Sequence, residues 1–325
     1  MKLNTKFFAA MMVATGLTAV QSMPSAHAAD KPSIGVAVAD QKSLFYIAAV
    51  EGMRDEAKKA GYDLKVASAA DSSTLQINQI QNLLVQQIGA LIFIPQDATA
   101  ADAGVRAANK VNVPVVAVDE RPESGSGKLS TYIATDSVKA ARDLCTWMFD
   151  QMGGKGNLAV LHGVLGATAE IQRTQGCQEA LKNYPNVHVV AQQTANWDET
   201  EAYKAAQNIL TAHPDLNAVF AESDAMALGA AKAAKQGDRA GIIVVGIDGF
   251  PTMFDAVKTG LTQATKAQRP YEMGEMAVRD AILLMDNKGK DIPAEQMMDA
   301  QLITKENVGQ FKPSVFYGSK ADSMH

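Results

Sequence analysis

Residues able to form hydrogen bonds follow several apolar segments of this sequence, at the point where each segment ends. Asp119-Glu120-Arg121 follows one such segment, Asp248 follows a second and Gln268 follows a third. Carboxylate and amide oxygens accept hydrogen bonds from hydroxyl groups, and arginine donates to hydroxyl or ring oxygens. Together these residue types support the binding of a molecule that carries several hydroxyl groups.

Aromatic residues occur at comparable points. Phe45 and Tyr46 lie beyond the first apolar segment, and Trp197 lies beyond a later one. A flat aromatic ring packs against the C–H face of a sugar while polar side chains bind its hydroxyls. An anionic ligand would require a net positive site, and these segments carry more acidic than basic residues. We therefore expect a neutral polyhydroxylated ligand.

Each of these residues also has a purely structural interpretation. Asp119 and Asp248 can cap helices or lie in surface loops. Phe45 and Tyr46 can belong to the core, and Arg173, within a predicted helix, can be solvated. Their shared position beyond apolar segments favours the binding interpretation over these alternatives.

The sequence contains none of the familiar catalytic or cofactor motifs. The glycine pair at 163–166 lacks the Gly-x-Gly start of a dinucleotide-binding turn, and no Gly-x-Ser-x-Gly occurs. Asp119 and Asp248 leave open a minor alternative, the acid/base pair of an exported glycoside-acting enzyme. The histidines show no spacing typical of a metal site; they are His27, His162, His188, His213 and His325. We expect no catalytic residues, no cofactor and no metal.

Short apolar runs alternate with segments of helical periodicity along most of the chain. Strands are expected at 34–38, 64–66, 90–94 and 113–118, with helices at 47–60, 74–87 and 98–109. After a polar stretch at 123–128, strands are expected at 129–134, 157–161, 187–191, 218–221, 242–247 and 261–267. The accompanying helices are expected at 138–152, 169–183, 199–212, 225–235, 251–258 and 271–287. This pattern predicts an α/β fold of two doubly wound parallel-sheet lobes, which bind ligands beyond the carboxyl ends of their strands.

The N-terminus has the three parts of a secretory signal peptide. Lys2 and Lys6 precede an uncharged apolar stretch at 7–20, and Ala26-His27-Ala28 predicts cleavage after residue 28, with Ala29 as the second choice. The alternative is a membrane anchor, but the stretch is shorter than the roughly 20 apolar residues that a spanning helix needs. No cysteine lies near the cleavage site, so we expect no lipid anchor.

Cleavage would leave 297 residues and lower the formal charge from −5 to −7, because the segment contains two lysines and no acid. An acidic chain without a basic run has no electrostatic footprint for nucleic acid. Cys145 and Cys177 lie on separate predicted helices. After export, a disulfide between them and two buried free thiols remain as alternatives.

The sequence resembles the periplasmic ribose-binding protein and its sugar-binding relatives, the substrate-binding components of ABC transporters. The resemblance covers essentially the whole chain after the signal peptide. It is most specific at LTAHPD (210–215), AVFA (218–221), MALGA (226–230) and VVGIDG (244–249). Repressors of the LacI type share the fold but carry an N-terminal DNA-binding head, and here a signal peptide occupies that place.

The resemblance implies two lobes joined by three crossings, near 128–134, 267–270 and 299–304, with the ligand held between them. It divides the chain into a first lobe (29–132 plus 269–298), a second lobe (133–268 plus 299–310) and a C-terminal tail (311–325). The implied protein is a periplasmic monomer that delivers a sugar or sugar alcohol to an inner-membrane permease. Carriage of a ligand to a chemoreceptor or sensor is the alternative.

The resemblance also implies which residues contact the ligand. Family contacts are matched at Phe45, Asp119, Arg173, Asp248 and Gln268, while Tyr46 and Trp197 take positions that are aromatic in the ribose binders. Three positions depart from the ribose binders: Ser43 replaces an asparagine, Glu120 an arginine and Ser223 an asparagine. Because an acceptor replaces a donor at Glu120, we expect a pentose other than ribose, a hexose or a linear sugar alcohol. Arg121 is a candidate to replace the lost donor.

Overall fold

The computed structural model describes residues 31–123, 125, 127–239 and 241–323, together with Met1. Apart from Met1, the predicted signal peptide lies outside the described residues. The chain divides into Met1–Lys31 and Pro32–His325, and the second part contains both lobes. Within the described residues, no helix combines the length and apolar character needed to cross a membrane.

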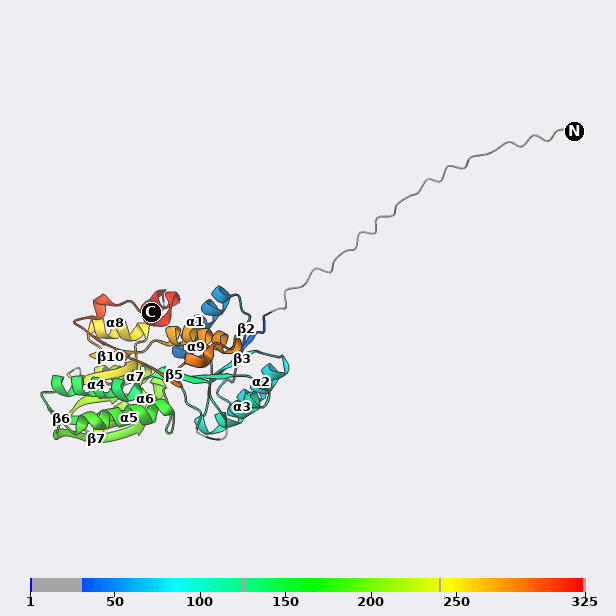
Figure 1. Ribbon diagram of the computed structural model, residues 1–325. Coiled ribbons are helices and arrows are strands. Elements are labelled where there is room, and N and C mark those ends of the chain that lie inside the picture. Colours follow the sequence, from blue (N-terminus) through cyan, green and yellow to red (C-terminus); the bar gives the residue numbers. More distant parts are fainter. Residues whose placement is uncertain (2–30, 124, 126, 240, 324–325) are drawn as a thin grey trace. The chain divides into compact units, whose positions relative to one another are not determined.

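The first lobe is a six-stranded sheet in the order β11-β5-β4-β3-β1-β2, with parallel neighbours throughout. Its strands are β1 (Ile34–Val38), β2 (Leu64–Ser68), β3 (Ala90–Ile94), β4 (Val115–Val118), β5 (Thr131–Thr135) and β11 (Glu295–Met298). Its helices are α1 (Leu44–Ala60), α2 (Ser73–Val85), α3 (Ala98–Lys110) and α9 (Pro270–Met285), and the 3₁₀ turn η1 (Gly289–Asp291) follows α9. Helices α1 and α9 cover one face of this sheet, and α2 and α3 cover the other (Figure 1).

The second lobe repeats this arrangement, in the order β12-β10-β9-β8-β6-β7. Its strands are β6 (Lys155–His162), β7 (Asn186–Thr194), β8 (Leu216–Ala221), β9 (Ile243–Asp248), β10 (Ala264–Ala267) and β12 (Gln301–Thr304). Its helices are α4 (Ser137–Gln151), α5 (Thr168–Leu181), α6 (Glu199–Ala212), α7 (Asp224–Gln236) and α8 (Pro251–Thr259). Only β12 departs from parallel pairing among these described strands, since it runs antiparallel to β10.

Burial explains why the central strands are apolar along their whole length. All five residues of β1 and all five of β3 are buried, because helices cover both faces of the sheet. In each sheet the strand order reverses beside the first strand, between β1 and β3 and between β6 and β8. Such reversals are where ligands bind in open α/β sheets. The predicted fold of two doubly wound lobes is confirmed.

The strands show where the chain passes between the lobes. The first passage follows Thr135. Strand β5 pairs with β4 as far as Ile133 and with β11 as far as Thr135, so the chain belongs to the first sheet up to that residue. The passage therefore lies about three residues beyond the predicted boundary after residue 132, and later than the predicted crossing at 128–134. The other passages lie between β10 and α9 and between β11 and β12.

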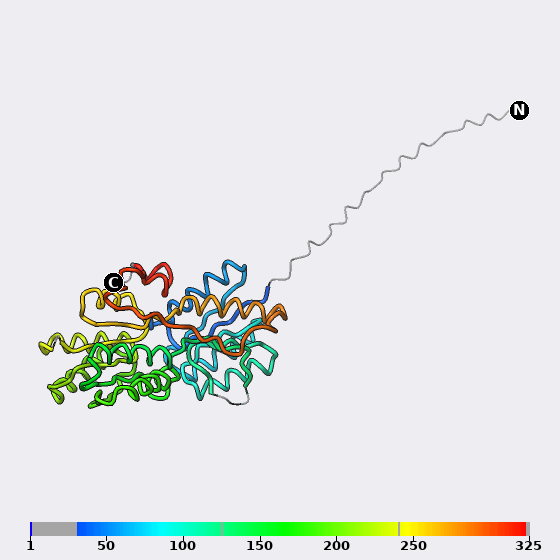
Figure 2. The backbone as a smooth tube through the Cα atoms, turned by 60° about the vertical axis from the view of Figure 1, so that its left-hand side comes forward, coloured from blue at the N-terminus to red at the C-terminus, as the bar shows by residue number. Residues whose placement is uncertain are grey.

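Residues 311–323, the described part of the predicted C-terminal tail, pack against the lobes. After η2 (Val308–Gln310), the chain forms α10 (Ser314–Tyr317) and η3 (Ser319–Ser323). Phe316 and Tyr317 are buried in a cluster that includes Ala48 of α1 and Phe254 of α8, one from each lobe. Figure 2 shows this segment in red beside the yellow part of the chain, which contains Phe254, and α10 also contacts α1 and α9. Its aromatic side chains explain why the predicted tail folds back onto both lobes.

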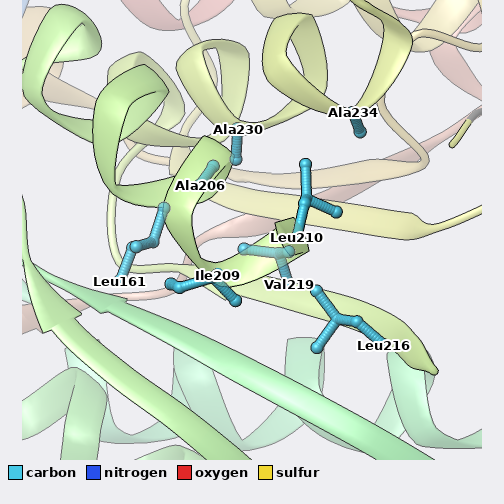
Figure 3. A pocket seen from close by; sticks show the side chains of 8 residues that line it. All are labelled: Leu161, Ala206, Ile209, Leu210, Leu216, Val219, Ala230 and Ala234. Carbon is cyan, nitrogen blue, oxygen red and sulfur yellow. The ribbon is translucent and has the colours of Figure 1, made fainter. Parts of the chain in front are cut away.

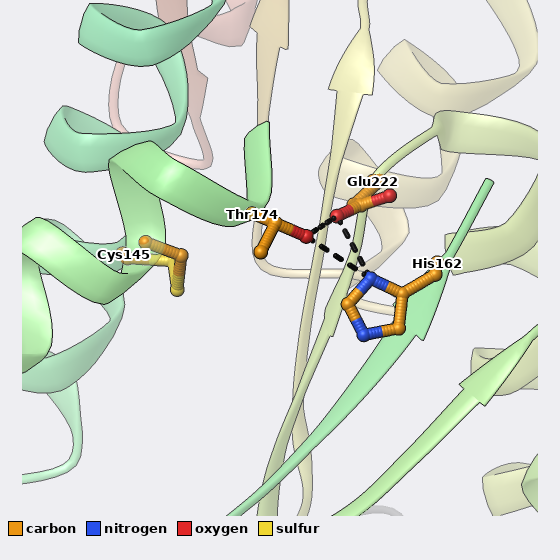
Figure 4. Close-up of a disulfide and its surroundings, with 5 residues drawn as sticks. Cys145, His162, Thr174 and Glu222 are labelled. Carbon is orange, nitrogen blue, oxygen red and sulfur yellow. Dashed lines mark hydrogen bonds and ion pairs between the residues drawn. A yellow bond between two sulfur atoms is a disulfide. The ribbon is translucent and has the colours of Figure 1, made fainter. Parts of the chain in front are cut away.

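The two cysteines are joined. Cys145 on α4 and Cys177 on α5 form a disulfide that spans 32 residues of sequence (Figure 4). Helices α4 and α5 pack against each other on the same face of the second sheet. The covalent link therefore connects two helices that are already neighbours.

Candidate functional site

Asp119 follows β4 in a left-handed backbone conformation, with a φ of 65°. Aspartate is one of the few residues that adopt this conformation readily. The Tyr132 hydroxyl donates to the Asp119 backbone oxygen over 2.6 Å. Burial raises the pKa of Asp119 to about 6, against the opposing charge of Arg173. The turn therefore holds a poorly solvated carboxylate opposite an arginine of the other lobe.

Arg173 lies on α5 and is buried, with 4% of its surface exposed. Its Nη1 donates to the backbone oxygen of Glu222 and lies 3.6 Å from Asp248 Oδ1. Its guanidinium also lies 5.6 Å from the centre of the Trp197 ring. The remaining Nε donor is buried without a hydrogen-bond partner in the described structure. A buried donor without an acceptor costs free energy, so this group is suited to an oxygen atom supplied by a ligand.

Asp248 ends β9 and is fixed from several sides. Its Oδ1 accepts a hydrogen bond from Gln268 over 2.8 Å, and its Oδ2 accepts one from the Asp224 backbone over 3.2 Å. Gln268 in turn accepts a 2.7 Å hydrogen bond from Thr135 of the first lobe. The Tyr317 hydroxyl donates to the Asp248 backbone oxygen over 2.9 Å. Burial raises the pKa of Asp248 to about 6.

Asp224 stabilises the loop that follows Asp248. Its carboxylate accepts hydrogen bonds from the backbones of Gly249 and Phe250 and from the Thr265 hydroxyl. Burial raises the pKa of Asp224 to about 8. Because this side chain is fully buried and fully engaged with protein groups, its role is to position the Asp248 loop.

Trp197 packs on the backbone of Gly163. Asn196 and Trp197 both adopt positive φ values, 51° and 64°, and this turn directs the indole toward the loop after β6. A Cβ atom added to Gly163 would lie 2.0 Å from the Trp197 ring. Residue 163 must therefore be glycine for Trp197 to keep its place beside Arg173.

We expect Gly163→Ala to displace the indole of Trp197 and to shift its fluorescence emission to longer wavelength as the ring becomes more solvated. Trp147 is the other tryptophan of this chain, so the measurement is made in a Trp147→Phe background. Gly241→Ala provides the matched control, because nothing lies within 4 Å of an added Cβ there. An unchanged emission maximum in Gly163→Ala would contradict the packing described here.

The predicted residues at the start of α1 lie at the edge of the first lobe's core. Phe45 is buried in the hydrophobic cluster beneath α1, and its ring meets Tyr46 edge-on at 5.6 Å. The half-buried Ser43 precedes α1, and its backbone donates to Asp40 Oδ1 over 2.9 Å. Phe45 is therefore part of the hydrophobic core, which is the structural alternative that the sequence analysis gave for this residue.

Three other predicted residues have protein partners. Glu120 accepts hydrogen bonds from the backbone and hydroxyl of Thr168, and burial raises its pKa to about 7. The Ser223 hydroxyl oxygen caps α7 by accepting from Met226 over 3.3 Å. Arg121 does not replace the lost donor: its guanidinium pairs with Glu295 at 2.5 Å and lies over the Tyr132 ring. The expectation that Arg121 replaces the lost donor is therefore corrected, because its guanidinium pairs with Glu295 of the first lobe.

Residues 34–290 of the chain match the family described as periplasmic binding protein domain. The chain belongs to this family. It is 32% identical over 304 residues to the ribose import binding protein of Salmonella typhimurium, covering 94% of this chain and all of that protein. It is 35% identical over 303 residues to a xylitol-binding protein of Mycolicibacterium smegmatis, covering 92% of this chain and 85% of that protein.

Solved structures of other periplasmic binding proteins have the same fold. The binding component of an arabinose ABC transporter from Shewanella sp. ANA-3, bound to L-arabinofuranose, superposes with a TM-score of 0.83 and 28% identity. This match covers 90% of the present chain and 98% of that one. A solute binding protein from Actinobacillus succinogenes with bound D-allose superposes with a TM-score of 0.82 and 29% identity, covering 86% and 100%.

This periplasmic binding protein also contains a polar cluster that sequence reasoning did not anticipate. His162 Nδ1 lies 3.1 Å from Glu222 Oε1 and 3.5 Å from Glu170 Oε1, and Thr174 donates to Glu222 over 2.7 Å (Figure 4). The hydrogen bond with Glu222 raises the pKa of His162. Histidine and glutamate also bind metal ions, but these hydrogen bonds and ion pairs account for the arrangement. The cluster fixes Glu222, whose backbone oxygen holds Arg173.

An apolar pocket lies inside the second lobe (Figure 3). Its lining is entirely aliphatic: Leu161, Ala206, Ile209, Leu210, Leu216, Val219, Ala230 and Ala234. It has no room for a water molecule. The pocket is a packing defect of the core, since a sugar requires polar partners that it does not offer.

Proposed function

We propose that this protein is the periplasmic solute-binding component of an ABC importer and binds a monosaccharide or sugar alcohol between its lobes. Arg173 carries this proposal: it is buried, its Nε has no hydrogen-bond partner among the described residues, and its charge acts on the carboxylates of both Asp119 and Asp248. A hydroxylated ligand supplies an oxygen to the arginine and hydroxyl donors to the two carboxylates. Trp197 and Tyr46 add aromatic surface for the C–H face of the ligand.

The closed lobes would hold the ligand away from water, where each polar contact is stronger than at an exposed surface. Separation of the lobes would break the contacts of Asp119 on one side from those of Arg173 and Asp248 on the other. The ligand would then pass to a membrane permease. The relatives named for ribose and xylitol, and the similar structure with bound D-allose, support a small sugar or polyol as the ligand class.

We infer binding without turnover and a periplasmic location. The similar proteins bear the names of binding proteins. The predicted signal peptide accounts for export. Recovery from the periplasm of a mature chain that begins at Ala29 tests the location.

A panel of pentoses, hexoses and sugar alcohols tests the function. We expect one or a few compounds to raise the melting temperature, because a ligand at 100 times its Kd stabilises the folded state by about 2.7 kcal/mol. Ribose is not expected to give the largest shift, since Glu120 replaces a ribose-binding arginine. The compounds should be recovered unchanged by mass spectrometry. A panel without any shift, or with a converted sugar, would refute the proposal.

A further inference from the structure

Glu120 and Thr168 connect the two lobes directly beside the proposed ligand site. Glu120 follows β4 in the first lobe, and Thr168 is the first residue of α5 in the second. Glu120 Oε1 accepts a hydrogen bond from the Thr168 backbone over 2.8 Å and another from the Thr168 hydroxyl over 2.6 Å. The same hydroxyl accepts a 3.2 Å hydrogen bond from the Arg121 backbone. Thr168 therefore joins the second lobe to the first through three hydrogen bonds.

These contacts complete the N-terminus of α5. The first backbone N–H groups of a helix lack partners within the helix, and a side chain at the preceding position usually supplies an acceptor. Ala167 occupies that position here and makes no side-chain hydrogen bond. The carboxylate of Glu120 serves instead, from the other lobe, and its negative charge suits the positive end of the helix.

The same two elements carry ligand-binding candidates. Asp119 immediately precedes Glu120, and Arg173 lies on α5, five residues beyond Thr168. When the lobes separate, the hydrogen bonds at Thr168 must break, and α5 loses its cap. The contacts thus exist only in the arrangement that also brings Asp119 toward Arg173.

We propose that Glu120 and Thr168 form an interlobe latch, which strengthens the binding of every ligand by stabilising the closed lobes without contacting the ligand. This proposal rests on the proposed function. It assigns Glu120, at the position of a sugar-binding arginine in the ribose binders, to closure rather than recognition.

A latch has a thermodynamic signature that a ligand contact lacks. The apparent Kd equals the intrinsic Kd divided by the fraction of protein that is competent to bind. A change in closure alone therefore multiplies the Kd of every ligand by one factor and preserves their order. Loss of a ligand contact changes the order, because different ligands use that contact differently.

The experiment measures the Kd of at least three ligands from the sugar panel for four variants. Thr168→Val keeps the shape of the side chain but removes its hydroxyl, and we expect each Kd to rise by about tenfold, the loss typical of one charge-assisted hydrogen bond. Thr168→Ser retains the hydroxyl and should bind nearly as the wild type does. The Kd values of Glu120→Gln should lie between those of Thr168→Val and those of Thr168→Ser. Thr200→Val, at an exposed position in the first turn of α6, is the matched control and should change nothing.

Wild-type affinity in Thr168→Val, or a changed order of ligands in Thr168→Val or Glu120→Gln, would overturn the latch. If the wild type binds no compound of the panel, the proposed function fails, and small-angle scattering of the free proteins decides the latch separately. A larger radius of gyration for Thr168→Val than for wild type and Thr168→Ser supports it. Equal radii under those conditions reject it.

Discussion

Asp119→Ala is expected to abolish sugar binding, and Asp119→Asn is expected to raise the melting temperature of the free protein, because asparagine tolerates the left-handed backbone at this position. Loss of affinity follows because the carboxylate is the first lobe's charged acceptor opposite Arg173, and two charge-assisted hydrogen bonds are worth at least roughly 100-fold in Kd. The gain in stability follows from the pKa of Asp119, which burial raises to about 6 from 3.8. The folded state therefore binds the proton more tightly than the unfolded state does.

The sign of this effect defines its pH window. Between about pH 4 and pH 6 the folded protein holds a proton at Asp119 that the unfolded chain has lost, so stability falls as pH rises through that window. Above it, the destabilisation by the buried charge is fully present. Asp119→Asn should consequently gain on the order of 2 to 4 °C at pH 7.5 and almost nothing near pH 4.

Calorimetric titration with the sugar found by the panel and thermal melts at the two pH values measure both effects. Asp119→Asn should lose less affinity than Asp119→Ala, because asparagine keeps an acceptor oxygen. Asp63→Ala changes an exposed aspartate at the opposite edge of the sheet and should alter neither property. An affinity within threefold of wild type in Asp119→Ala would remove Asp119 from the ligand site.

Reduction of the Cys145–Cys177 disulfide is expected to lower the melting temperature by roughly 10 °C. The link closes a loop across 32 residues of sequence, and the loop-closure entropy of that length is about 3 to 4 kcal/mol. Helices α4 and α5 retain their packing on the second sheet, so the fold should persist in the reduced protein. Reduction of the disulfide should therefore lower the free energy of unfolding without changing the folded arrangement of α4 and α5.

Thermal melts with and without a thiol reductant measure this effect. The double variant Cys145→Ser/Cys177→Ser should melt near the reduced wild type and be insensitive to the reductant. Equal melting temperatures for oxidised and reduced wild type would show that the disulfide does not stabilise the fold. A stabilising disulfide accords with the proposed location, because such links persist in oxidising compartments such as the periplasm.

The sequence alone determined the two-lobed fold and the position of most proposed ligand contacts. The strand at 90–94 and the helix at 199–212 were predicted at the bounds that the structure gives. Their signals are local, since a buried parallel strand is apolar throughout and an amphipathic helix repeats every three to four residues. Asp119 and Asp248 could be proposed as site residues because each follows or ends an apolar strand, and ligands of such folds bind beyond the carboxyl ends of the strands.

The short strands β11 and β12 had no comparable signal. Their sequences, Glu-Gln-Met-Met and Gln-Leu-Ile-Thr, form strands because β5 and β10 offer backbone partners. Strands of this kind are stabilised by pairing rather than by their own apolar pattern. The end of β5, and with it the first passage between the lobes, depended on the same pairing.

Only the tertiary structure decided which polar groups meet. Glu120 meets Thr168 across 48 residues, Tyr317 meets Asp248 across 69, and Arg121 meets Glu295 across 174. Each residue type was visible in the sequence, but a hydrogen bond depends on distance and direction in space, which local composition does not encode. The residue types therefore predicted the chemistry of the site, while the packing of the lobes decided that Glu120 and Arg121 bind protein groups there.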